Sequence, residues 1–232
     1  MFRFKQFDID DSLSAMKIGT DGVLLGAWAR VECCHSILDV GTGTGLITLM
    51  AAQRNAEAHI TAIDIDSMAA KEACLNAQHS PWSHRITVLH ADVRSLAPER
   101  KFDHIVSNPP YFNDSLHSPD VARSTARHTD TLGYAELVAL AERMLMEGGR
   151  LSVVLPADCA PRFRREAFGR LWLSRETDVV TREGEEPKRS LMEFLLTSEP
   201  IMPRCDRLTI HHHDGSYTEE YRHLTEDFYL AF

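Results

Sequence analysis

The sequence has no apolar run long enough to cross a membrane, and its cysteines are not paired. Its longest apolar stretches, residues 46–52 and 151–155, fall well short of the roughly 18–20 residues that span a bilayer. The first residues lead into an acidic stretch, so we expect no secretory signal, no membrane association and a cytoplasmic location. Five cysteines without CxxC spacing predict neither a disulfide framework nor a zinc site.

Positive charge is also scarce. Lys and Arg total 25 against 34 for Asp and Glu, a formal net charge of -9, which argues against nonspecific coating of nucleic acid. Any nucleic-acid site must therefore be local. Basic residues gather at Arg123 and Arg127, in the run 162–170, and at 188–189. The run 162–170 fits a solvated helix face.

Internal repeats, low-complexity segments and linkers are absent as well. We therefore expect a single domain over residues 1–232, with 1–30 as a leading segment and 203–232 as a C-terminal appendage. Short runs rich in Ile and Val alternate with segments of helical period, which predicts an α/β fold with a mainly parallel sheet and helices on both faces. The predicted strands are residues 36–40, 59–64, 85–90, 102–107 and 150–155.

The pattern changes after residue 155. A basic helix over 158–171 leads to two further strands, 174–181 and 191–197, which the charged loop 182–189 joins as a hairpin. The tail contains a possible strand at 207–211 and a short helix at 217–224, whose places in the fold the pattern does not determine. Neighbouring side chains on a strand point to opposite faces, so His211 to His213 are not expected to bind a metal ion.

A glycine loop follows the first predicted strand and precedes a helical pattern. Asp39-Val-Gly41-Thr-Gly43-Thr-Gly45 lies where open parallel sheets bind nucleotide cofactors, at the carboxyl ends of the strands. Glycines let the backbone turn sharply and approach a ligand closely. A nicotinamide cofactor is an alternative, although its G-x-G-x-x-G fingerprint places the last glycine differently.

Three carboxylates follow neighbouring strands. Asp64 ends the second strand at about the distance where dinucleotide folds place a carboxylate on a ribose. Asp66 competes for that role but also suits a helix cap. Asp92, just beyond the third strand, is a candidate acceptor for the cofactor's adenine amine, with a surface turn as the alternative.

The motif that indicates the chemistry is Asn108-Pro109-Pro110-Tyr111, which directly follows the fourth strand. The lone pair of an amide or aromatic amine is delocalised, so such a nitrogen is a poor nucleophile. The Asn108 side-chain oxygen and the Pro109 carbonyl can accept the two amine protons and aim the lone pair at a methyl group, and Tyr111 can stack on a planar base. An ordinary Pro-Pro turn is the alternative.

With these motifs together, the chain resembles class I, Rossmann-like methyltransferases that carry a D-x-G-x-G-x-G loop and an NPPY motif. The opening segment 16–26, the motif 108–111 and the endings 217–221 and 227–229 are similar to bacterial tRNA1(Val) adenine-N(6)-methyltransferases. This resemblance covers nearly the whole chain. It implies a seven-stranded sheet with a β-hairpin near the C-terminal end, and S-adenosylmethionine-dependent methylation of the adenine just 3′ of the anticodon in tRNA.

The resemblance also implies site residues. Asn108, Pro109, Pro110 and Tyr111 would take the target base, and we expect the RNA to dock on Arg123 and Arg127. No metal is implied. The residues implied at the cofactor are Gly19, Thr20, Asp39, Gly41, Thr42, Gly43, Gly45, Asp64 and Asp92.

Two other functions stay open. NPPY also resembles the motif of methyltransferases that act on a glutamine side chain of release factors, whose amide poses the same lone-pair problem. The opening and closing segments, and the lack of a separate N-terminal helical domain, disfavour that function. A non-catalytic cofactor- and RNA-binding module is the other alternative, and the intact Asn108 and Tyr111 disfavour it.

Overall fold

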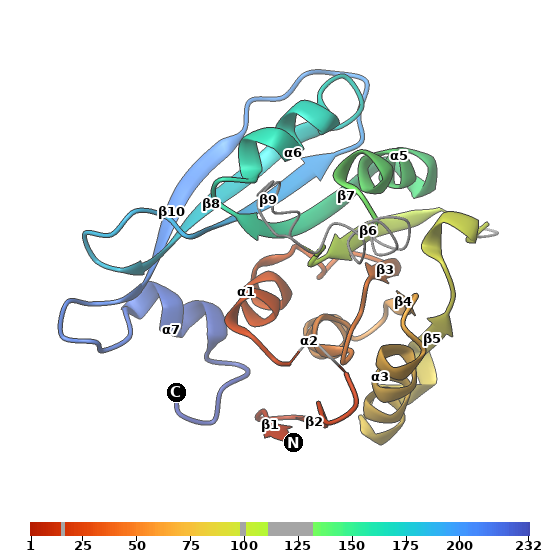
Figure 1. The fold of residues 1–232 in the computed structure, drawn as a ribbon, viewed down its shortest axis with the longest axis horizontal. Coiled ribbons are helices and arrows are strands. Elements are labelled where there is room, and N and C mark those ends of the chain that lie inside the picture. The colour runs from red at the N-terminus through yellow and green to blue at the C-terminus, as the bar shows by residue number, and fades with distance from the viewer. Residues whose placement is uncertain (15–16, 98–100, 111–131) are drawn as a thin grey trace, which may run out of the picture.

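The computed structural model describes residues 1–14, 17–97, 101–110 and 132–232. Within them, one eight-stranded sheet with the order β10-β8-β9-β7-β6-β3-β4-β5 forms the centre of the molecule, and a two-stranded sheet joins β1 to β2 (Figure 1). The strands are β1 (Phe2–Arg3), β2 (Asp8–Ile9), β3 (Ser36–Val40), β4 (His59–Asp64), β5 (Ile86–His90), β6 (Phe102–Ser107), β7 (Leu145–Pro156), β8 (Trp172–Arg182), β9 (Arg189–Leu195) and β10 (Arg204–His211).

Helices cover both faces of the large sheet. In Figure 1, α1, α2 and α3 lie on one face, and α5 and α6 lie on the other. The helices are α1 (Thr20–Trp28), α2 (Leu46–Arg54), α3 (Ser67–His79), α5 (Tyr134–Met144), α6 (Ala160–Ala167) and α7 (Glu219–Thr225), with 3-10 turns η1 (Ser83–Arg85) and η2 (Val93–Ser95). The predicted alternation of strands and helices is confirmed.

The central strands are buried on both sides. Ile37 and Leu38 of β3 and Ile105 and Val106 of β6 have no exposed surface, as continuous apolar runs in a parallel sheet require. Val40, the last residue of β3, pairs with β4 on one side and β6 on the other. The loops that follow β3, β4 and β6 therefore emerge together at one edge of the sheet.

The second half of the sheet contains the predicted hairpin and one strand more than the seven expected. β8 and β9 pair antiparallel, and β9 lies between β7 and β8. The additional strand is β10, which pairs parallel to β8 at the sheet edge. Its Leu208 and Ile210 are buried against the apolar cluster that includes residues of α1 and α7. This burial and the pairing with β8 fix the position of the C-terminal tail in the fold.

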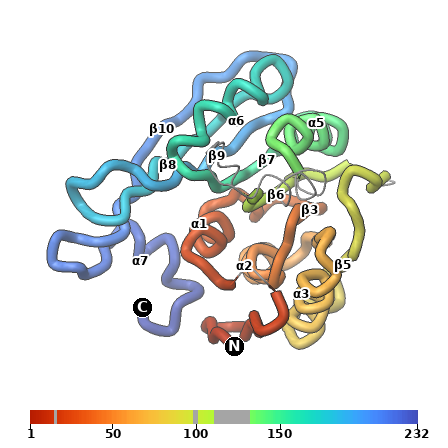
Figure 2. Tube along the Cα trace, viewed as in Figure 1, coloured from red at the N-terminus to blue at the C-terminus, as the bar shows by residue number. Residues whose placement is uncertain are grey.

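The leading segment and the C-terminal end meet on the same side of the molecule (Figure 2). Phe4, Phe7 and Phe228 are buried in one apolar cluster, and the Lys5 amide donates a hydrogen bond of 2.8 Å to the Phe228 carbonyl. None of the helices in the described ranges has the length and apolar character needed to span a membrane.

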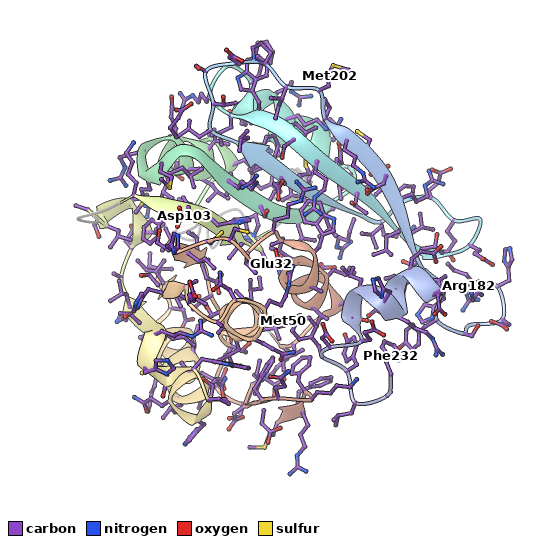
Figure 3. The ribbon with its side chains drawn as sticks, turned by 180° about the vertical axis from the view of Figure 1, so that it is seen from behind. Glu32, Met50, Asp103, Arg182, Met202 and Phe232 are labelled. Carbon is purple, nitrogen blue, oxygen red and sulfur yellow. The ribbon has the colours of Figure 1, made fainter. Side chains whose placement is uncertain are left out.

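At the end of the sheet where β3 and β6 begin, polar side chains form hydrogen bonds with backbone groups. Asp103, labelled in Figure 3, accepts hydrogen bonds of 2.8 Å from the amides of His35 and Ser36. The Asn55 side chain donates to the carbonyls of Val31 and Cys34, at 2.6 and 2.8 Å. This edge is opposite the one that carries the glycine loop.

Candidate active site

A cavity of about 240 Å³ lies where β3, β4, β5 and β6 end. Its walls are mostly apolar, with two prolines and a few carboxylates among them. The lining residues are Ser14, Val40, Gly41, Gly43, Ile63, Asp64, Ile65, Asp66, Ala69, Ala91, Asp92, Val93, Arg94, Ser107, Asn108, Pro109, Pro110 and Leu132. The cavity thus brings the glycine loop, the three predicted carboxylates Asp64, Asp66 and Asp92, and the start of the NPPY motif into one site.

The glycine loop presents backbone to this cavity. Gly41 and Gly43 both have positive φ, 71° and 58°, a conformation that L side chains rarely adopt. A Cβ added at either position would meet no atom within 4 Å, so the space beside them is open to a ligand. The Gly41 and Thr42 amides donate to the Ile63 carbonyl, at 2.9 and 3.1 Å, which fastens the loop to the end of β4.

Asp39 lies behind the loop and does not line the cavity. It is fully buried, and the hydroxyls of Thr42 and Thr48 each donate to its Oδ2 at 2.7 Å. Burial raises the pKa of Asp39 to about 6, against the lowering effect of these hydrogen bonds. Gly45 also lies away from the cavity, and an added Cβ would contact Ala73 of α3 at 3.4 Å. These residues hold the loop's shape.

Asp64 connects the loop to the cavity wall. Its Oδ2 accepts a hydrogen bond of 2.9 Å from the Gly43 amide, and its Oδ1 accepts one of 2.9 Å from the Asp66 amide. Asp66, the competing candidate, caps α3 by accepting from the amides of Met68 and Ala69. The cap expected of Asp66 is therefore present, although Asp66 also lines the cavity.

Asp92 lines the same cavity as part of an ion network. Arg94 donates through Nε to both Asp92 oxygens, at 3.0 and 2.9 Å, and pairs with Glu136 of α5 at 3.3 Å. These Arg94 hydrogen bonds lower the pKa of Asp92. The sequence analysis did not identify Arg94 as a cavity residue. Its position two residues after Asp92 could have indicated an ion pair between the two side chains. Ser14 and Leu132 were missed as well, and no motif marks them.

The NPPY motif begins at the opposite wall of the cavity. The Ser107 hydroxyl donates a hydrogen bond of 2.9 Å to the Val40 carbonyl, which fixes the end of β6 against β3. Asn108, Pro109 and Pro110 follow and line the cavity. Tyr111 lies outside the described residues, as do Arg123 and Arg127.

Gly19 and Thr20 do not line this cavity. Gly19 is the N-cap of α1 and Thr20 is its first residue. Gly22 and Gly26 face α2 instead, where an added Cβ would come within 2.9 Å of Leu46 or 2.6 Å of Met50. Gly22 and Gly26 thus allow α1 and α2 to pack closely.

The histidine run takes part in other contacts. His212 pairs through Nδ1 with Glu183 at 2.7 Å, and His211 Nδ1 lies 3.1 Å from the Gly215 carbonyl. Within the described ranges, no group of three or more potential ligands is placed to hold a metal ion.

The cavity suits a cofactor with a polar sugar and an apolar body. Asp64 and Asp92 can accept hydrogen bonds from hydroxyl and amine groups, and the open face of Gly41 and Gly43 admits close approach of a ligand. Apolar side chains such as Ile63 fill the remaining wall. These acceptors and apolar walls therefore fit S-adenosylmethionine, with its ribose, adenine and methionine parts.

Known proteins match this chain over most or all of its length. The methyltransferase small domain family matches residues 17–177. Relatives called tRNA1(Val) (adenine(37)-N6)-methyltransferase include one from Bacteroides thetaiotaomicron, 45% identical over 99% of this chain and 97% of its own. Another, from Phocaeicola vulgatus, is 48% identical over 99% of this chain and 97% of its own.

A solved structure gives the same fold. A predicted O-methyltransferase from Agrobacterium tumefaciens has a TM-score of 0.69 at 24% identity, covering 90% of this chain and 96% of its own. This similarity supports the class I methyltransferase fold that the resemblance implies.

Proposed function

The chain belongs to the tRNA1(Val) (adenine(37)-N6)-methyltransferase family, and from this membership we propose that it methylates the 6-amino group of adenine 37 in tRNA1(Val). It is an S-adenosylmethionine-dependent enzyme. One observation carries the proposal: Asn108 and Pro109 line the same cavity as Gly41, Gly43 and Asp64. The acceptors for an amine thus share one cavity with the cofactor cradle. A tRNA substrate also fits the expected cytoplasmic location.

Residues on both sides of the cavity have roles in the proposed reaction. We assign Gly41, Gly43 and Asp64 to holding the cofactor, and Asp92 to its adenine. Bound S-adenosylmethionine supplies the methyl group, which leaves the sulfonium sulfur and forms a bond to the amine nitrogen. Asp39 and Thr42 support the loop from behind.

Asn108 prepares the amine. Its side-chain oxygen and the Pro109 carbonyl accept hydrogen bonds from the two amine N–H groups, so the nitrogen lone pair turns out of the plane of the base and toward the methyl group. The prolines at 109 and 110 hold this turn rigid because proline fixes φ. After transfer, the nitrogen loses one proton to water and the product is neutral N6-methyladenine. Tyr111 is assigned to stacking on the base from its place in the motif.

A methyl-transfer assay tests the proposal. Transcripts of tRNA1(Val) with adenine or guanine at position 37 are incubated with the protein and S-adenosylmethionine carrying a labelled methyl group. We expect one N6-methyladenosine per tRNA in the first transcript and none in the second, measured by mass spectrometry of nucleosides. A release factor is incubated in parallel, and label on its glutamine would favour the alternative acceptor and contradict the proposal.

The Asn108→Ala variant tests the catalytic role separately. We expect S-adenosylmethionine to bind as before while turnover falls about 100- to 1,000-fold, the usual loss when one preorganised polar group is removed from a reacting centre. Titration calorimetry measures the first quantity and initial rates the second. Unchanged turnover in this variant would contradict the role of Asn108 in the reaction, whereas cofactor binding without any turnover by the wild type would favour a module that binds without catalysing.

A further inference from the structure

Residues 10–14 form a segment that lies outside the range matched by the methyltransferase small domain, which begins at residue 17. Ser14 nevertheless lines the cofactor cavity and is 4% exposed. The segment, called the strap below, therefore contributes a wall to a cavity whose other walls belong to the family domain. Two buried polar side chains of α3 hold it there.

The first is Glu72. Its side chain is 1% exposed, and its two carboxylate oxygens accept hydrogen bonds from consecutive strap amides, Leu13 at 2.6 Å and Ser14 at 2.8 Å. Burying a carboxylate is costly unless hydrogen bonds compensate for the lost water. Because Ser14 is buried as well, its amide would lack this partner without Glu72, so Glu72 and the strap depend on each other.

The second is Asn76, one helical turn later. Its Oδ1 accepts a hydrogen bond from the Asp10 amide at 2.9 Å, and its Nδ2 donates to the Asp10 carbonyl at 2.8 Å. The same Nδ2 donates to the Thr44 carbonyl at 2.9 Å. Thr44 belongs to the glycine loop. One side chain thus ties the strap and the glycine loop to the same helix.

The residues before the strap are fixed independently. Phe4, Phe7 and Ile9 are buried in the apolar cluster that also contains Phe228. Loss of the α3 contacts would therefore release residues 10–14 while the preceding residues stay packed. In Figure 1 this leading segment runs below α2 and α3.

We propose that Glu72 and Asn76 are positioning residues for S-adenosylmethionine: they fix the strap and the glycine loop on α3 so that both cavity walls are in place before the cofactor binds. A wall ordered in advance spares the binding step the entropy of ordering it. Neither residue lines the reacting end of the cavity, so the effect falls on cofactor affinity and not on the methyl-transfer step. The inference goes beyond the proposed function, since it holds whichever amine is methylated.

The test compares Asn76→Ala with Asn55→Ala. Both residues are buried, at 4% and 3% exposure, and both bond only to backbone groups in the contacts described above, but Asn55 lies at the opposite edge of the sheet. Titration calorimetry gives the dissociation constant for S-adenosylmethionine, and thermal unfolding gives the loss of stability. Steady-state kinetics with the tRNA1(Val) transcript that has adenine at position 37 gives KM for the cofactor and kcat separately.

We expect Asn76→Ala to weaken cofactor binding about 10- to 100-fold, the range for lost hydrogen bonds to buried groups, with a matching rise in KM and with kcat within about twofold. Asn55→Ala is expected to lower the unfolding temperature to a similar extent and leave the dissociation constant unchanged. Equal affinity in the two variants, or a fall in kcat alone, would overturn the proposal.

Glu72 provides a second, graded series. Glu72→Gln keeps one carbonyl acceptor for the two strap amides, so we expect a smaller loss of affinity than in Glu72→Ala. Should Glu72→Ala fail to fold, hydrogen exchange of the Leu13 and Ser14 amides in Glu72→Gln decides the question. The proposal predicts faster exchange without cofactor and restored protection when S-adenosylmethionine is added. Protection that the variant does not alter would contradict it. If RNA methylation fails while these cofactor effects appear, the failure concerns the proposed RNA substrate and not the strap.

Discussion

At the scale of single residues, two carboxylates near the glycine loop have separate tasks. Asp64 lines the cavity and also accepts a hydrogen bond from the Gly43 amide. Asp39 is buried and accepts hydrogen bonds from threonine hydroxyls. Both positions could be predicted from the motif, but their division of roles could not. The division of roles depends on which of the two side chains faces the cavity, and the sequence of the loop does not indicate this.

Replacing Asp64 with alanine is expected to weaken S-adenosylmethionine binding by about 1–3 kcal/mol, the usual cost of unpaired hydrogen-bonding groups. Titration calorimetry measures this loss. Asp66→Ala is the matched control, since it removes a neighbouring carboxylate whose oxygen caps α3; it should lower stability by about 1 kcal/mol with a smaller effect on binding. Binding of NAD in place of S-adenosylmethionine would contradict the cofactor assignment.

His104 gives a pH dependence of stability. Burial lowers its pKa to about 3, and its ring nitrogens contact the Arg30 carbonyl and the Ser152 hydroxyl, at 3.1 and 2.9 Å. Between pH 3 and the ordinary value of 6.5, the unfolded chain binds more protons at this residue. His104 therefore stabilises the fold fully above pH 6.5 and progressively less as the pH falls toward 3.

The measurement compares the wild type with His104→Gln by denaturant unfolding from pH 7 to pH 4. The advantage of the wild type should shrink by up to about 1.4 kcal/mol per pH unit within the window. Asp39, whose raised pKa acts in the opposite direction, is present in both proteins and cancels in the difference. Parallel stability curves would show that His104 does not titrate in this way.

At the scale of elements, the central strands and the tail's short strand and helix could be predicted, but the place of the tail in the fold could not. The strands predicted at 36–40, 59–64 and 102–107 have the observed bounds, because continuous Ile and Val runs between turn residues leave few alternatives. The tail strand is mostly exposed at its start, and its place depends on pairing with β8. The contact between Glu72 and the strap spans 58 positions, so no local pattern indicates it.

The glycine loop gives a prediction at this scale. Gly45 has φ of 84°, and alanine there should cost about 1–2 kcal/mol of unfolding free energy from backbone strain. Gly215→Ala is the control, since Gly215 has a similar φ of 86° and an added Cβ would meet nothing within 4 Å. The two variants should lose similar stability, because the Cβ added at Gly45 would make only an ordinary van der Waals contact with Ala73, at 3.4 Å. A much larger loss in Gly45→Ala, measured by denaturant unfolding, would contradict a cost that comes from backbone strain alone.

At the scale of the whole molecule, charge and substrate are at odds. The formal net charge is -9, yet a tRNA is a polyanion whose binding depends on neutralising phosphates. Among the described residues that line the cavity, Arg94 is the one Lys or Arg, and it is paired with Asp92 and Glu136. Docking must therefore use a local basic surface, for which Arg123 and Arg127 remain the predicted residues.

Changing Arg123 and Arg127 together to alanine is expected to weaken tRNA binding and to reduce its dependence on salt, while cofactor affinity stays the same. Filter binding at several salt concentrations measures both quantities. The control is the pair Arg164→Ala and Arg165→Ala on α6, where Arg164 already pairs with Glu176. If only the α6 pair lowers affinity and salt dependence, the docking surface lies on that helix.

The central claim, methylation of adenine 37 through the Asn108 turn, is tested most directly in cells. The wild-type chain and Asn108→Ala are each expressed in a bacterial strain whose own tRNA1(Val) is unmodified at this position, and position 37 of the purified tRNA is analysed by mass spectrometry. The account predicts N6-methyladenine with the wild type and a far smaller methylated fraction with the variant at equal protein levels. Unmodified adenine 37 with the wild type, or equal methylation with both, would contradict it.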